Sequence, residues 1–142
     1  MSEVSTLRLY LLRGMYLLIA VGLALTIWPS IIAPPDSVAN ASTVIRSLLG
    51  ALALLSALGL RYPLKMLPLL LFELLWKVIW VVAFALRMWL AGGLDGYASE
   101  TLFACMIGVV LVPVVMPWGY VFRQYFKALG DPWRQAGPRR AA

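Results

Sequence analysis

The 142-residue sequence has no histidine, one cysteine and only six acidic residues against twelve basic ones. Without histidine the chain cannot build a histidine-based metal site or a histidine-ligated haem. A single cysteine excludes an internal disulfide and a CxxC redox motif. This residue, Cys105, lies in an apolar run, where a thiol usually serves as a small packing residue. The sequence therefore predicts no cofactor.

Charged residues are also scarce. They make up 13% of the chain, whereas 63% of the residues are hydrophobic and the mean hydropathy is +0.89. A soluble domain is usually about half apolar and about a quarter charged, so this composition indicates a lipid bilayer as solvent. The net charge of +6 does not indicate nucleic acid as a partner. The basic residues flank apolar segments, where they set orientation and attract anionic lipid headgroups.

Four apolar segments are long enough to cross a membrane, which takes roughly 20 helical residues. Links that contain proline, glycine or polar residues separate them. The predicted spans are residues 14–33, 42–60, 65–90 and 101–120. The sequence thus predicts an all-α, integral membrane four-helix bundle with up-down-up-down order. It forms one domain over residues 1–129, and a basic, disordered cytoplasmic tail follows over 130–142.

The basic residues predict an orientation. With four spans, the N-terminus, the turn at residues 61–65 and the C-terminus lie on the same side of the membrane. Nine basic residues fall on this side, and only Arg46 and Arg87 fall on the other. The positive-inside rule assigns the more basic side to the cytoplasm. We therefore predict a multi-pass protein of the bacterial inner membrane with both termini in the cytoplasm.

The third predicted span carries charges at a depth where they are costly. At 100° per residue, Glu73, Lys77 and Arg87 fall on one helical stripe about 80° wide. Aromatic residues line this stripe, namely Trp76, Trp80 and Phe84. Glu73 precedes Lys77 by four residues, which is the favourable helical spacing for an ion pair. Two interpretations remain open: a structural ion pair that orients the helix, or a polar site for a ligand, a proton or a partner.

Arg46 and Arg87 are expected near the opposite membrane interface. One interpretation is that both side chains extend toward lipid phosphates or loop acids. The other is an outward-facing anion pocket, since the planar guanidinium binds carboxylate or phosphate through two hydrogen bonds.

In addition, small residues recur in the second span, including the pairs Ser47/Ala51 and Ala53/Ala57. These pairs predict close helix packing, either within the bundle or in a dimer.

Residues 49–61 (LGALALLSALGLR) form a leucine run that is flanked by glycines and ends in a basic residue at the predicted cytoplasmic turn. This stretch resembles the DoxX-like family of small four-helix bacterial membrane proteins. The chain length, the four predicted spans and an Arg-Gly pair at Arg13 agree with that resemblance. The resemblance implies a quinone-linked oxidoreductase subunit, in which Trp76, Trp80 and Lys77 would surround the quinone ring.

The residues themselves favour a different role. The sequence has no nucleophile with a nearby base, no metal-ligand cluster and no phosphate-binding loop. We therefore expect a small inner-membrane protein that is a non-catalytic accessory or assembly subunit of a larger membrane system. Its partner would be another membrane protein or a second copy of the chain. The alternative is a small transporter or an anion- or lipid-binding protein that uses the charged side chains named above.

Overall fold

The computed structural model describes residues 4–35, 38–134 and 137, and within these ranges it contains helices and no strand. The four long helices are α1 (Thr6–Thr26), α3 (Ala41–Arg61), the continuous helix formed by α4 (Leu67–Trp80), η1 (Val81–Ala85) and α5 (Leu86–Leu90), and α6 (Gly96–Val115). Each is long and apolar enough to cross a membrane. The predicted all-α class and the four apolar helices are therefore confirmed. The short helices are α2 (Trp28–Ile32), α7 (Trp118–Phe122) and η2 (Arg123–Lys127).

The first and fourth helices have different bounds from the predicted spans. The first helix begins at Thr6 rather than at residue 14, because Ser5 caps it there, and it ends at Thr26. The chain from Trp28 then forms the separate helix α2, with a proline in its first turn. The fourth helix begins at Gly96 rather than at residue 101, because Asp95 caps it, and it ends at Val115 rather than at residue 120, because the following residue is extended. Of the predicted disordered tail, residues 135–136 and 138–142 lie outside the described residues.

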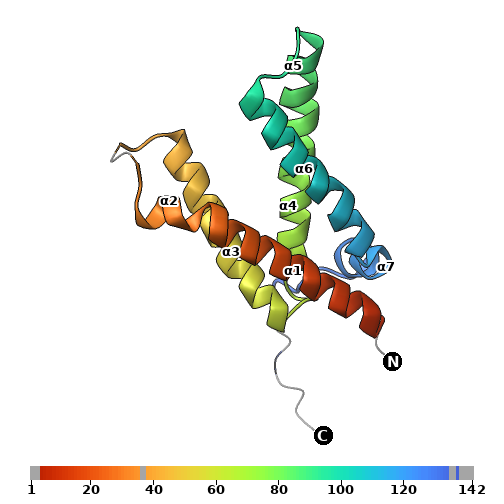
Figure 1. Ribbon diagram of the computed structural model, residues 1–142. Helices are drawn as coiled ribbons and strands as arrows, with labels where there is room; N and C mark the ends of the chain where they lie inside the picture. The colour runs from red at the N-terminus through yellow and green to blue at the C-terminus, as the bar shows by residue number, and fades with distance from the viewer. Residues whose placement is uncertain (1–3, 36–37, 135–136, 138–142) are drawn as a thin grey trace, which may run out of the picture.

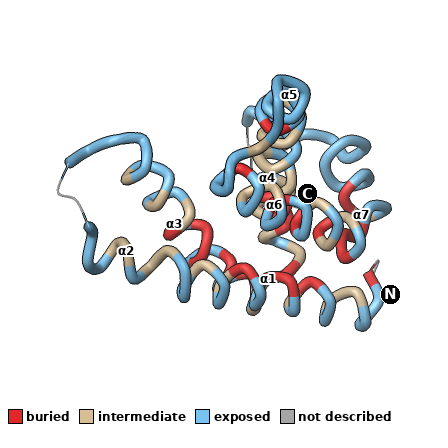
Figure 2. The backbone as a smooth tube through the Cα atoms, turned by 45° about the horizontal axis from the view of Figure 1, so that its top comes forward, coloured by how far each residue is buried: buried red, intermediate tan, exposed pale blue. Residues whose placement is uncertain are grey.

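The long helices form two arms (Figure 1). α1 packs along α3 in one arm, and α4 packs along α6 in the other. The arms meet near the turn that joins α3 to α4, and they diverge toward α2 and α5 (Figure 1). Buried positions gather where α1 meets the other helices, whereas α2 and α5 are mostly exposed or half-buried (Figure 2). The two arms thus form an open V (Figure 1), and only 17–28% of the most apolar stretch of each span is buried.

Small residues allow α1 to approach α3 closely. The buried face of α3 contains Gly50, Ala53, Ser56 and Gly59. A Cβ on Gly59 would lie 2.5 Å from Cδ1 of Tyr16, so the tyrosine ring packs directly on the glycine backbone. Of the residues in the predicted pairs, Ala53 lies on this seam, whereas Ser47, Ala51 and Ala57 are exposed. Packing of the exposed small residues in a dimer stays a prediction.

Side chains of α1 cap the ends of the helices where the two arms meet. The Tyr16 hydroxyl donates to the Pro63 carbonyl (2.8 Å), and the Arg13 Nε donates to the Leu60 carbonyl (3.0 Å). A guanidinium nitrogen of Arg8 donates to the Val114 carbonyl near the end of α6 (2.6 Å). Carbonyls in the last turn of a helix have no partner within the helix. Arg8 and Arg13, which belong to the nine basic residues that predict the orientation, therefore also join α1 to α6 and α3.

Aromatic and basic residues follow the fourth long helix. The Trp118 indole donates to the Pro113 carbonyl (2.9 Å), and the rings of Phe122 and Phe126 lie 5.3 Å apart. Lys127 Nζ lies 5.8 Å from the Phe122 ring centroid. Partial burial raises the pKa of Tyr125 above its ordinary value. A mixture of aromatic and basic side chains is typical of segments that lie at the headgroup level.

Candidate functional site

Glu73 and Lys77 form an ion pair on the inner face of α4, as their spacing predicted. The second carboxylate oxygen of Glu73 accepts a hydrogen bond from the Trp76 indole (2.9 Å). Lys77 Nζ also lies 5.5 Å from the Trp76 ring centroid. Glu73 is only 4% exposed, so both of its oxygens are satisfied inside the protein. The three side chains form one compact polar cluster within an apolar helix.

Gly108 on α6 makes room for this cluster. A Cβ on Gly108 would lie 2.5 Å from Lys77 Nζ and 2.9 Å from its Cδ. The lysine side chain therefore lies against the backbone of the facing helix. A glycine at this point admits a long cationic side chain between two helices, which a larger residue would prevent. Ala104 and Gly108 are small residues four positions apart, a spacing that favours close helix packing, but this spacing does not indicate that Lys77 is the partner.

Two adjoining pockets lie between the arms, and we call them together the inter-arm groove. The first has a volume of about 240 Å³ and lies between α1 and α6. The second has a volume of about 360 Å³ and extends to Tyr97 and Glu100, near the start of α6. Both pockets are lined by Leu23, Glu73, Lys77 and Ala104. The ion pair thus lies at the junction of the two pockets, and most of the remaining wall is apolar.

The predicted stripe on the third span is interrupted after Trp80. Residues Val81–Ala85 form a π-helical turn, which contains one more residue than an α-helical turn. The extra residue rotates the following positions by about 100° relative to the expected α-helical register. Ala85 is therefore buried at 3% exposure, whereas Phe84 is 57% exposed and Arg87 is exposed on α5. The prediction of one continuous charged stripe was wrong for this reason.

The aromatic residues of the predicted stripe have different environments. Trp76 lines the inter-arm groove and contacts both members of the ion pair. Trp80 is half-buried one turn later, before the π-helical segment. Phe84 lies within that segment and is exposed. Of the three, only Trp76 belongs to the polar cluster.

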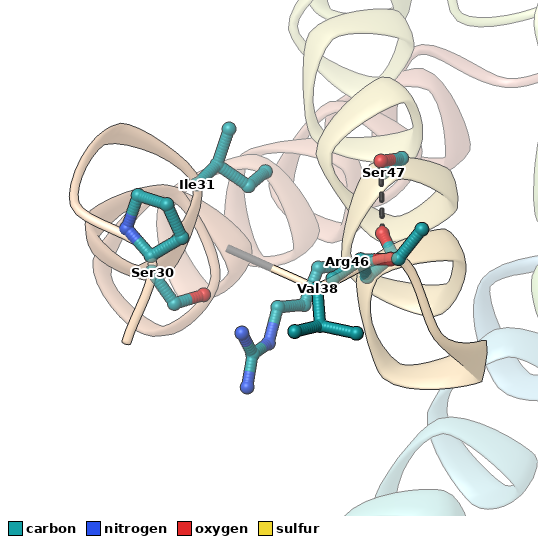
Figure 3. Close-up of a pocket in the computed structure, with 8 residues that line it drawn as sticks. Ser30, Ile31, Val38, Arg46 and Ser47 are labelled. Carbon is teal, nitrogen blue, oxygen red and sulfur yellow. Dashed lines mark hydrogen bonds between the residues drawn. The ribbon is translucent and has the colours of Figure 1, made fainter. Parts of the chain in front are cut away.

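The second predicted pair, Arg46 and Arg87, is not brought together. Arg46 lines a pocket of about 310 Å³ between α2 and the start of α3, together with Ser30 and Ser47 (Figure 3). Arg87 lies on α5 in the other arm (Figure 1). The two arginines therefore lie on different arms, which diverge toward α2 and α5 (Figure 1). Of this predicted pair, Arg46 lines a pocket, whereas Arg87 is exposed on α5.

Cys105 is buried on α6, which agrees with the packing role that the sequence predicts for it. Within the described ranges, no group of three or more histidine, cysteine, aspartate or glutamate side chains could hold a metal ion. The site therefore consists of one ion pair, one indole and a mostly apolar wall, with Glu100 and Thr101 at one end. Such a site can orient a helix, accept hydrogen bonds or donate them from the lysine ammonium.

Comparison with known proteins finds no matching family model, no matching curated protein and no matching solved structure. The DoxX-like resemblance of residues 49–61 accordingly stays a prediction. What the fold defines is the broader class, a protein with four helices that could span a membrane.

Proposed function

We propose that the chain is a non-catalytic subunit of a larger membrane assembly and that the inter-arm groove receives a transmembrane helix of its partner. The observation that carries this proposal is the open V with a satisfied ion pair inside it. Because Glu73 and Lys77 neutralise each other, an apolar helix can lie against them without a charge of its own. The groove wall is mostly apolar, as the packing of such a helix requires.

Gly22 supports a helix as the occupant. It lines the groove on α1, and no atom lies within 4 Å of the position that its Cβ would take. Exposed glycine on a membrane helix lets a second backbone approach closely, which provides van der Waals contact and polar backbone contacts. Gly59 has the same role inside the chain, where Tyr16 covers it. Gly22 has no such cover within the described part of the chain.

We also propose that the chain lies in a bacterial inner membrane. The proposed order of its spans is up-down-up-down, with both termini in the cytoplasm. The positive-inside pattern of the sequence supports it. The contacts from Arg8, Arg13 and Tyr16 to the ends of α6 and α3 are consistent with this order. Cysteine substitutions at Lys65 and Ser99, made in a Cys105→Ala background, test it with an impermeant thiol reagent in intact cells. Labelling at residue 65 without labelling at residue 99 would contradict the proposed orientation.

A photo-crosslinking experiment tests the subunit role. A photoreactive side chain at Ala104, which lines both pockets, should give a crosslinked product of defined size in the native membrane. The same group at Phe103, which is 72% exposed, is the matched control on the neighbouring position. Gly22→Leu should abolish the product because the leucine fills the groove, whereas Gly14→Leu should not. Gly14 has open space around it and lies outside the groove.

The crosslinked products distinguish the proposed docking in the groove from its alternatives. A product from residue 104 that survives Gly22→Leu would contradict docking in the groove. A product whose mass is twice that of the chain would identify a second copy as the partner. A chain that gives no product and always purifies alone in mild detergent would contradict the subunit role.

A second candidate function is binding or transport of a small amphiphilic ligand in the same groove. The position of Lys77 favours it, because this lysine lines both pockets and its ammonium has three donors, whereas Glu73 is its one acceptor within the described part of the chain. Lys77→Met should abolish ligand-dependent thermal stabilisation or uptake if this function holds. Unchanged binding in that variant would exclude it. The quinone-linked role rests on the family resemblance alone and stays a prediction.

A further inference from the structure

The pocket between α2 and α3 lies apart from the inter-arm groove and contains an arginine without a partner in the described part of the chain. The Arg46 side chain extends from α3 into the space between the Ser30–Ile31 segment and Val38 (Figure 3). No hydrogen bond or ion pair joins Arg46 to another described residue, whereas Arg8, Arg13 and Arg123 each donate to a carbonyl. Among the described residues, none therefore engages the guanidinium N–H donors of Arg46 beside this pocket.

The two serine hydroxyls of this pocket differ from the arginine, because they already donate hydrogen bonds within the chain. Ser30 donates its only hydroxyl proton to the Ile27 carbonyl (2.7 Å), and Ser47 donates its proton to the Thr43 carbonyl (2.9 Å). A serine hydroxyl has one donor and two acceptor lone pairs. With the protons engaged in the backbone, these oxygens can only accept hydrogen bonds from a ligand. The pocket thus combines a cluster of cationic donors with neutral acceptors.

We propose that this pocket binds the headgroup of a phospholipid whose phosphate contacts Arg46 and whose second polar group donates to Ser30 and Ser47. Ethanolamine and glycerol headgroups fit this chemistry, because an ammonium or a hydroxyl can donate hydrogen bonds. Choline does not, since its trimethylammonium has no N–H. The apolar part of the wall, which includes Ile31 and Val38, suits the first methylene groups of the acyl chains of a lipid.

The position of the pocket agrees with a lipid ligand. α2 contains Trp28 and follows the first span directly, and tryptophan is enriched at the membrane interface. A guanidinium binds phosphate through parallel charge-assisted hydrogen bonds, which are shorter and stronger than neutral ones. The proposal is independent of the partner proposed for the inter-arm groove, because the two sites share no lining residue.

Lipid-dependent thermal stability tests the proposal with the purified full chain in detergent micelles. Phosphatidylethanolamine and phosphatidylglycerol should raise the Tm more than phosphatidylcholine with the same acyl chains. Arg46→Gln should weaken the apparent affinity for both lipids by at least about tenfold, as expected for loss of a charged hydrogen-bonding partner. Arg87→Gln is the matched control: it removes the same charge from the other exposed arm and should leave the affinity unchanged.

Two further variants separate the parts of the site. The double substitution Ser30→Ala with Ser47→Ala should remove the preference over phosphatidylcholine and keep the dependence on Arg46. Arg46→Lys keeps the charge without the planar fork and should give an intermediate affinity. Equal stabilisation by all three lipids, or equal losses in Arg46→Gln and Arg87→Gln, would overturn the proposal. So would full stabilisation by inorganic phosphate alone, since the ligand would then be a free anion.

Discussion

The Lys77 side chain occupies the space beside Gly108 on the facing helix, where a Cβ would lie 2.5 Å from the lysine Nζ. The Lys77 side chain and the absence of a side chain at Gly108 thus determine how closely α4 and α6 pack at the level of the ion pair. The two residues lie 31 positions apart in the sequence.

Gly108→Ala should destabilise the protein, because the new methyl group must displace the lysine ammonium or separate the helices. Overpacking of this kind costs about 1–3 kcal/mol in a well-packed interior. Unfolding in mixed micelles with increasing SDS measures the change in free energy. Gly96→Ala is the control on the same helix, since no atom lies within 4 Å of its Cβ position. If Lys77→Ala does not relieve the cost of Gly108→Ala, the clash is not with the lysine.

The ion pair should behave as a unit in a double-mutant cycle. Glu73→Gln or Lys77→Met alone leaves one buried charge without its partner, and such a loss costs about 3–5 kcal/mol in buried pairs. The double variant removes both charges and should recover most of that stability. The same SDS unfolding measurement gives all four corners of the cycle. Additive losses in the double variant would show that the two side chains act independently.

Tyr16→Phe should lower the free energy of unfolding by about 1 kcal/mol, since it removes the hydroxyl that donates to the Pro63 carbonyl and keeps the ring on Gly59. Tyr10→Phe is the control on the same helix. Tyr10 is 65% exposed, its hydroxyl has no hydrogen-bond partner among the described residues, and phenylalanine keeps the aromatic face near Arg13. Equal effects of the two substitutions would contradict a specific role of the Tyr16 hydroxyl.

Deletion of Val82 should restore α-helical register in the third span and rotate the residues after it by about 100°. Ala85 would then leave its buried position, and Arg87 would turn toward the interior. We expect a lower unfolding temperature and less protein in the membrane. Val82→Ala is the control, because Val82 is exposed and the substitution keeps the chain length. A deletion variant as stable as the parent would show that the π-helical turn does not determine the packing.

Several features of the site followed from local patterns in the sequence. The spacing of Glu73 and Lys77 predicted their pairing, since residues four apart are neighbours on a helix. The burial of Cys105 followed from its apolar surroundings. The position of Arg87 did not follow, because the prediction assumed one α-helical period across the whole span. The sequence contained no proline or glycine that would have marked the π-helical turn.

The sequence by itself determined the four apolar helices. Hydropathy over about 20 residues is a local property, and an apolar segment of that length is stable in lipid as a helix. The sequence also determined the ion pair, which depends on one helical turn. Only the tertiary structure decided that the helices open into a V, that Lys77 lies on Gly108, and that α1 caps α3 and α6. These contacts join distant segments, and apolar helices in lipid have many packing faces of similar energy. The choice among them depends on close approach at a few small residues.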